Sequence, residues 1–145
     1  MSDIHAFTCT VSMTAAATPA DIWALWVDVG NWSGWDEGIE CSRLVAQFRE
    51  GGTIELTPKG AGPVTVELKT VTQGEEFSDE TVLPFGTLKN SHRLEPLGDR
   101  VLITHTVQAL INADSVGFFE DAVWPHMQGG VAESLGQLIS IAQAA

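Results

Sequence analysis

The fold of this chain is decided by two stretches of sequence, TPADIWALWVDVGNWSGWD at residues 18–36 and DSVGFFEDAVWPHMQGGVAESLGQLISIAQA at residues 114–144. Both have the apolar spacing of helices that bury one face. Between them lie short runs of alternating apolar and polar residues, separated by glycine and proline turns, which is typical of antiparallel strands. We therefore expect an α+β fold in which a curved antiparallel sheet wraps around the long C-terminal helix.

The first stretch carries the signals of a helix start. Thr18 can cap the helix, Pro19 suits its first turn, and Asp21 complements the helix dipole. A second, short helical turn is expected over residues 31–35. The apolar spacing predicts a buried helix face that consists of Ile22, Leu25, Trp26 and Val29.

Alternation predicts one strand before this helix and six strands after it. The final helix should then pack a broad apolar face against the sheet. Pro125 lies within that helix and lacks the amide that would bond the carbonyl of Asp121, which predicts a bend near residues 124–125. Gly129 and Gly130 should allow close approach of a ligand or of strand backbone. The expected strands are residues 6–14, 39–48, 53–57, 64–72, 76–83, 87–95 and 101–111.

Length and composition restrict the possible functions. The 145 residues are expected to form a single ligand-binding domain, residues 1–145. A net charge of -12 disfavours nucleic acid as a partner and disfavours anionic membranes, and no apolar run is long enough to insert into a bilayer. The N-terminal segment 1–5 lacks the features of a signal peptide, and the two cysteines form no disulfide framework, so we expect a cytoplasmic protein.

No strong catalytic, phosphate-binding or metal-binding motif occurs in the sequence, so no cofactor and no metal are expected. The best polar candidates lie on the last two strands. Asn90 and His92 share a strand face with apolar residues, and His105 does so on the next strand, so all three should point inward. The two histidines could bind a polar group of a ligand or act as acid and base. Alternatively, each makes one satisfied hydrogen bond in the core.

Other residues admit two interpretations. Trp32 and Trp35 could rim a ligand entrance or could anchor the second helical turn on the sheet. His126 could face a cavity or lie at the solvated edge of the final helix. Arg43 and Arg93 are expected to pair outward with acidic residues. The final helix should contribute the remaining ligand-binding residues, which are Phe119, Val123, Met127, Gly130 and Val131.

Several short motifs, in this order and spacing, are shared with one superfamily. They are TPADIW at 18–23, NWSGWD at 31–36, GT at 52–53, PKG at 58–60, HRLE at 92–95 and THTV at 104–107. Through them the chain resembles the START-like polyketide cyclase/dehydrase and lipid-transport superfamily, which has the birch-pollen-allergen-like helix-grip fold. The resemblance implies this fold and an apolar cavity, and it implies no particular reaction or catalytic set.

Three functional hypotheses follow. The leading one is a protein that binds a hydrophobic or aromatic small molecule, such as a lipid or a polyketide, in an apolar cavity between the sheet and the C-terminal helix. The second is a cyclase or dehydratase of the aromatic polyketide type that uses His92 and His105 as acid and base. The third is an accessory protein that docks a partner at the cavity mouth. The sequence does not specify the ligand or the oligomeric state.

Overall fold

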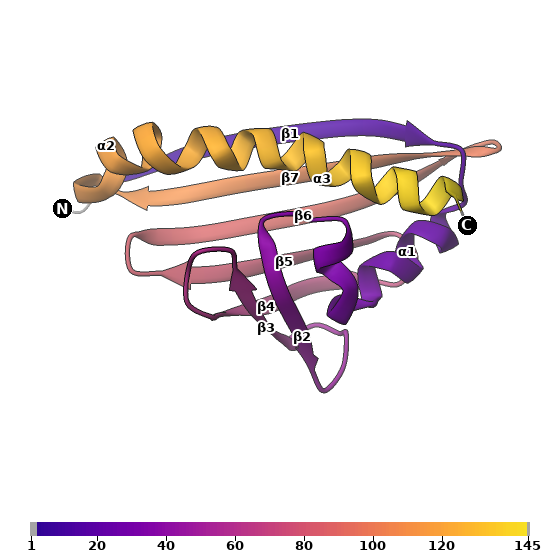
Figure 1. Ribbon diagram of the computed structural model, residues 1–145, viewed down its shortest axis with the longest axis horizontal. Helices are drawn as coiled ribbons and strands as arrows, with labels where there is room; N and C mark the ends of the chain where they lie inside the picture. Colours follow the sequence, from indigo (N-terminus) through magenta and orange to yellow (C-terminus); the bar gives the residue numbers. More distant parts are fainter. Residues whose placement is uncertain (1–2, 145) are drawn as a thin grey trace.

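One antiparallel sheet of seven strands forms the main layer of the protein, and a long C-terminal helix lies along it (Figure 1). This computed structural model describes residues 3–144, so the first two residues of the N-terminal segment and the last residue of the expected domain lie outside the described residues. The strand order is β1-β7-β6-β5-β4-β3-β2, with every neighbouring pair antiparallel. The fold class predicted from the sequence is therefore confirmed.

The strands agree closely with the predicted ones. An exception is the strand predicted over residues 39–48, which ends at Val45 because Ala46 adopts a left-handed backbone with a φ of 74°. The bounds are β1 (Ile4–Ala15), β2 (Ile39–Val45), β3 (Thr53–Pro58), β4 (Val64–Thr72), β5 (Glu76–Leu83), β6 (Gly86–Leu97) and β7 (Arg100–Asn112).

Two short helices follow β1, namely α1 (Pro19–Val27) and the 3-10 helix η1 (Val29–Gly34). The predicted cap of α1 is a complete capping box. The Asp21 amide donates to Thr18 Oγ1 at 3.1 Å, and the Thr18 amide donates to Asp21 Oδ2 at 3.0 Å. The hydrogen bond from the Thr18 amide is the main cause that lowers the pKa of the Asp21 carboxyl, and the Thr18 side chain adds to it. Of the predicted buried face, Ile22, Trp26 and Val29 are buried and Leu25 is half-buried.

The predicted C-terminal helix of residues 114–144 consists of four consecutive segments. They are η2 (Ala113–Ser115), α2 (Val116–Phe118), the π-helical η3 (Phe119–Val123) and α3 (Trp124–Ala144). Pro125 is the second residue of α3, and a π-helical segment lies directly before α3. The bend near residues 124–125 stays a prediction. None of the helices described is both long and apolar enough to cross a bilayer.

The buried residues form two clusters, with α3 contributing to both. The larger surrounds Trp26, Phe77 and Leu135, and the smaller contains Phe119, Trp124 and Ile111. The helix α3 contacts β1, β7 and α1, so it lies against one edge of the sheet (Figure 1). The strands β6 to β2 continue the sheet away from α3 and lie below this helix in the view of Figure 1.

Candidate functional site

A pocket of about 650 Å³ lies between the sheet and the C-terminal helical segments, and its wall takes residues from both buried clusters. This volume is in the range of sites that take drug-sized ligands, about 300–1,000 Å³. Most of the wall is apolar, with contributions from β2 to β7, η1, η3 and α3. Of the ten residues predicted to bind ligand, nine line it: Trp32, Trp35, Asn90, His92, His105, Val123, Met127, Gly130 and Val131.

Phe119, the tenth of these residues, does not line the pocket, and its ring is buried in the smaller core cluster. Its centroid lies 5.2 Å from that of Phe7 and 5.9 Å from that of Trp124, and it is 1% exposed. The π-helical segment begins at Phe119, so the spacing of an ideal helix does not carry through to the residues after it. Phe119 therefore fills the smaller core cluster.

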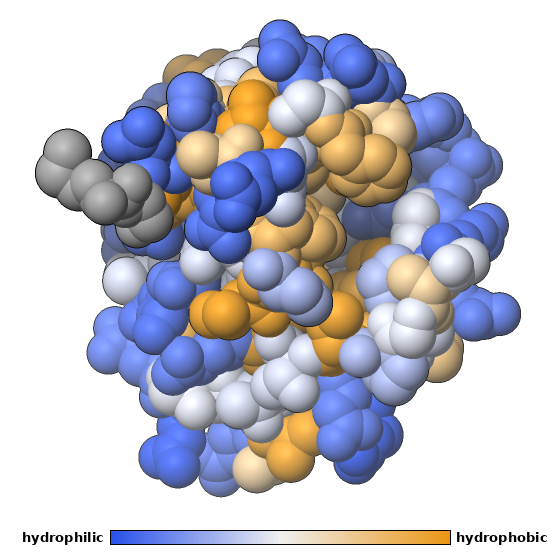
Figure 2. Space-filling model, turned by 90° about the vertical axis from the view of Figure 1, so that its left-hand side faces the viewer, coloured by the Kyte–Doolittle hydropathy of each residue, from blue (hydrophilic) through white to orange (hydrophobic). Residues whose placement is uncertain are grey.

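The pocket opens between the C-terminal helix and the turn that joins β3 to β4. On the helical side, Ala122, His126 and Gly130 line the pocket and are exposed, and on the turn Lys59 and Ala61 do the same. We call these five residues the pocket mouth. His126 thus combines both interpretations drawn from the sequence, since it lies at the solvated edge and also borders the pocket. Figure 2 shows hydrophobic side chains gathered around a hollow on one end face of the molecule.

His92 and His105 form the centre of the polar part of the wall. They are directly opposite each other on β6 and β7, and their ring centroids are 4.5 Å apart in an edge-to-face arrangement. The His92 ring stacks on Phe77 at 4.1 Å, and the His105 ring lies 5.8 Å from Trp26. Four buried side-chain nitrogens have no hydrogen-bond partner among the described residues, and they are His92 Nδ1, His105 Nε2, Trp26 Nε1 and Trp35 Nε1.

Burial keeps both imidazoles neutral. It lowers the pKa of His105 from 6.5 to about 4. For His92, burial is the main cause and the neighbouring His105 adds to it, and together they place the pKa well below its ordinary value. A hydrogen bond with the backbone of Phe77 raises the pKa of His92, but its effect is smaller than that of burial. At neutral pH each ring is therefore a neutral hydrogen-bonding group, and His105 is a weak base.

Asp79 is a site residue that the sequence reasoning missed. It lies on β5 opposite Asn90 of β6, and Asn90 Nδ2 donates to Asp79 Oδ1 at 3.0 Å. Asp79 is 5% exposed and lines the pocket, and burial raises its pKa to about 7, against the effect of the Asn90 hydrogen bond. The sequence does contain a signal for Asp79. It lies two residues after the apolar Phe77 on the same strand, and alternate residues of one strand share a face, so Asp79 is expected on the inner face with Phe77.

Two tryptophans, one in η1 and one directly after it, close another side of the pocket. Trp32 and Trp35 are 4% and 6% exposed, so they anchor η1 on the sheet while also forming part of the wall. Trp32 Nε1 donates to the Trp26 carbonyl at 2.8 Å. Burial raises the pKa of the neighbouring Asp36, an effect that the Gly38 amide and the charge of Lys59 oppose.

The predicted outward pairing of the arginines is confirmed. Arg43 lies 2.7 Å from Glu55, and Arg93 lies 3.6 Å from Glu76, with all four side chains substantially exposed. Such pairs contribute little to stability because solvent screens them. Among residues 3–144, no arginine lines the pocket.

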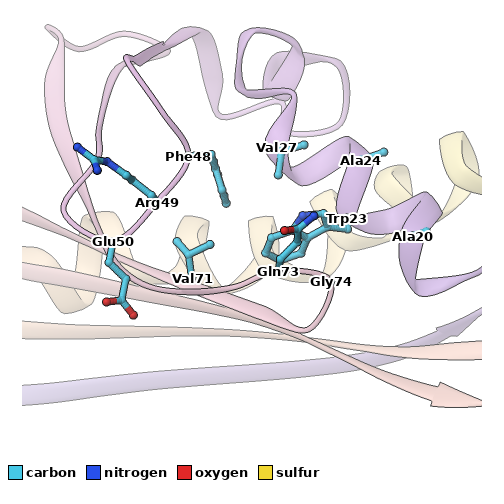
Figure 3. Close-up of a pocket in the computed structure, with 10 residues that line it drawn as sticks. All are labelled: Ala20, Trp23, Ala24, Val27, Phe48, Arg49, Glu50, Val71, Gln73 and Gly74. Atoms are coloured by element: carbon cyan, nitrogen blue, oxygen red, sulfur yellow. The ribbon is translucent and has the colours of Figure 1, made fainter.

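A second hollow, of about 720 Å³, lies between α1 and the loops that join β2 to β3 and β4 to β5 (Figure 3). Trp23 and Phe48 form its apolar part, with ring centroids 5.9 Å apart. Its polar side chains, Arg49, Glu50 and Gln73, are all exposed. Because it holds no buried polar group, we take the pocket beside α3 as the candidate site.

Comparison with known proteins identifies the family. A family model described as polyketide cyclase/dehydrase and lipid transport matches residues 6–143. The chain belongs to this family. It shares the helix-grip fold of the family, and the resemblance inferred from the sequence is therefore confirmed. Among curated proteins, none matches this sequence.

Solved structures with the same fold differ widely in sequence. Norcoclaurine synthase from Thalictrum flavum is 14% identical, with a TM-score of 0.74 over 95% of this chain and 87% of that chain. The Zhui aromatase/cyclase from a Streptomyces species is also 14% identical, with a TM-score of 0.78 over 95% and 94% of the two chains. A protein from Chromobacterium violaceum is 16% identical, with a TM-score of 0.68 over 94% and 96%. At these identities the similarity shows the fold alone.

Proposed function

We propose that this protein binds a hydrophobic or aromatic small molecule in the pocket between the sheet and α3. The observation that carries the proposal is an apolar wall with one buried polar patch, formed by Asp79, Asn90, His92 and His105. Buried polar groups without partners are costly, at about 1–3 kcal/mol each, so such a patch suits a ligand that brings a polar group. The apolar wall suits the rest of its surface.

Calorimetric titration with 2-naphthylmethanol tests the proposal, because this probe combines a flat apolar body with one hydroxyl group. We expect one molecule to bind per chain. Native mass spectrometry of protein purified from its own host should in addition reveal a retained ligand. No uptake of 2-naphthylmethanol or of any comparable aromatic probe would contradict the proposal.

Gly130→Leu should weaken 2-naphthylmethanol binding by about ten-fold. Gly130 lines the pocket mouth, and a Cβ placed there meets no atom within 4 Å, so a leucine side chain would extend into open space at the pocket. No strand backbone approaches this glycine, which corrects that part of the expectation drawn from the sequence. The measurement is calorimetric titration of both proteins.

Gly129→Leu is the matched control for this prediction. Gly129 is also exposed and also has no atom within 4 Å of an added Cβ, but it does not line the pocket. Both changes remove a helical glycine and should stabilise α3 by similar amounts, about 0.5–1 kcal/mol. Equal binding by the two variants would mean that Gly130 does not border the bound ligand.

A second candidate function is that of an enzyme of cyclase or dehydratase type. It is favoured by the raised pKa of Asp79, since a group with a pKa of about 7 in a pocket wall is suited to proton transfer. The sequence suggested His92 and His105 for this role. With its pKa of about 4, His105 suits hydrogen bonding to a substrate better than it suits base catalysis. Asp79→Asn would abolish turnover by such an enzyme.

The third hypothesis, an accessory protein that docks a partner, requires a contiguous apolar patch outside the pocket. The described part of the chain exposes five large hydrophobic side chains. They are Ile4, Val82, Leu97, Phe118 and Ile141.

A further inference from the structure

We propose that the ligand carries an organic cation, such as a protonated amine, beside its apolar body, and that the Asp79 carboxylate receives this cation. The inference rests on the proposed function and names the ligand class of the same pocket. It begins from an imbalance of charge in the pocket wall, where one buried carboxyl has no basic partner.

Asp79 is placed to contact a ligand directly. It lies in the middle of β5, with Leu68 of β4 on one side and Asn90 of β6 on the other. The hydrogen bond from Asn90 Nδ2 is the one its side chain makes within residues 3–144. The carboxyl group can accept more than one hydrogen bond, so it retains capacity for a donor in the pocket.

No lysine or arginine of the described residues pairs with Asp79. The ion pairs in this part of the chain join Arg43 to Glu55, Lys69 to Glu67 and Arg93 to Glu76, all on the outer surface. Carboxylates buried in proteins are ordinarily paired with a cation or hydrogen-bonded on several sides. A ligand cation would supply the missing partner.

The other titratable groups of the pocket wall do not act as a cationic partner for Asp79. Of the residues that the structure describes, Lys59 at the pocket mouth is the one lysine or arginine in the wall, and its charge acts on Asp36. His92 and His105 are neutral for the reasons given above, and His126 lies at the exposed mouth. The wall therefore holds two carboxyl groups and one lysine, a balance that opposes an anionic ligand and favours a cationic one.

The protonation of Asp79 provides a further signature. Because burial raises its pKa to about 7, a large part of the carboxyl is protonated near neutral pH. A cation binds the ionised form, so its binding should release a proton from Asp79 and should strengthen as the pH rises. His105 titrates near pH 4 and does not contribute to this change at neutral pH.

Three naphthalene probes of the same shape test the inference by calorimetry at neutral pH. They are 2-naphthylmethylamine, which is cationic, 2-naphthylmethanol, which is neutral, and 2-naphthoate, which is anionic. We expect the amine to bind about ten-fold more tightly than the alcohol, and the naphthoate to bind more weakly than either. The preference for the amine should increase between about pH 6 and pH 8, while the alcohol affinity stays constant.

Asp79→Asn should remove the preference for the amine over the alcohol, measured as the ratio of the two dissociation constants, and should remove the pH dependence of that ratio. Asp36→Asn is the matched control, because Asp36 is the other carboxyl of the wall and already has Lys59 nearby, and it should keep the preference. Thermal melting establishes that both variants fold.

The outcomes separate this inference from the proposed function. If none of the three probes binds, the proposed function itself fails. If the alcohol binds as tightly as the amine, or if the naphthoate binds best, the pocket binds aromatic molecules but the cation inference is wrong. The same holds if Asp79→Asn keeps the preference for the amine.

Discussion

Trp26→Ala should lower the free energy of unfolding by about 3–5 kcal/mol, which is the usual cost of removing a large aromatic ring from a core. Trp26 is 0% exposed, and its ring centroid lies 5.3 Å from that of Phe77, 5.4 Å from that of His92 and 5.8 Å from that of His105. It therefore joins α1 to the strands that carry the histidine pair. Urea unfolding followed by circular dichroism measures the loss.

Trp23→Ala provides the comparison within the same helix. Trp23 is half-buried and borders the outer hollow, so its removal should cost clearly less, about 1–2 kcal/mol. Total stabilities of domains are about 5–15 kcal/mol, so Trp26→Ala could leave too little folded protein to measure. In that case Trp26→Leu, which should lose less unfolding free energy, replaces Trp26→Ala in the comparison with Trp23→Ala. Equal losses at positions 23 and 26 would show that Trp26 is not at the centre of the core.

The fold was predictable because its signals are local. Thr18, Pro19 and Asp21 specify the start of α1 through one capping box, and the capping box forms as expected. The alternation in β5, β6 and β7 separates an inner face from an outer one without any knowledge of the partner strands. The end of β2 was not predictable, because nothing in the sequence marks Ala46 for a left-handed backbone.

The candidate site was predictable only in part. Strand parity places Asn90, His92 and His105 in the pocket wall, and it would also have placed Asp79 there. The wall residues of the C-terminal helix depend on where the sheet curves and on the π-helical segment before Pro125. Neither feature is encoded in the helical spacing, and for this reason the spacing predicts Phe119 in the pocket wall, which it does not line.

Acid should destabilise the protein through the histidine pair, and His105→Leu should relieve this effect. In the unfolded chain His105 takes up a proton below its ordinary pKa of 6.5, whereas in the folded protein its pKa is about 4. Between these values the unfolded state binds more protons, so folding stability falls as the pH falls. The difference in pKa corresponds to roughly 3 kcal/mol. His105→Leu should therefore gain stability over the wild type by about this amount between pH 7 and pH 4.

Asp79 changes the folding stability with pH in the opposite direction to His105. Comparison of the wild type with His105→Leu removes the contribution of Asp79. Because its folded pKa is raised to about 7, ionisation of Asp79 lowers stability as the pH rises from 3.8 towards 7. This effect is common to the wild type and to His105→Leu, so the difference between their unfolding free energies isolates the histidine. Urea unfolding at a series of pH values provides the measurement, and a difference that stays constant with pH would contradict the prediction.

The same variant decides whether the histidine pair is available for a ligand. His105 Nε2 has no partner among the described residues, so replacing the ring by an apolar side chain of similar size should cost no stability at neutral pH. It should, however, weaken the binding of 2-naphthylmethanol by about five- to ten-fold, since one hydrogen bond is lost. His92→Leu should behave in the same way, because His92 Nδ1 also lacks a partner. If both variants are instead destabilised and bind the alcohol normally, the two imidazoles serve the core and the polar end of the ligand lies elsewhere.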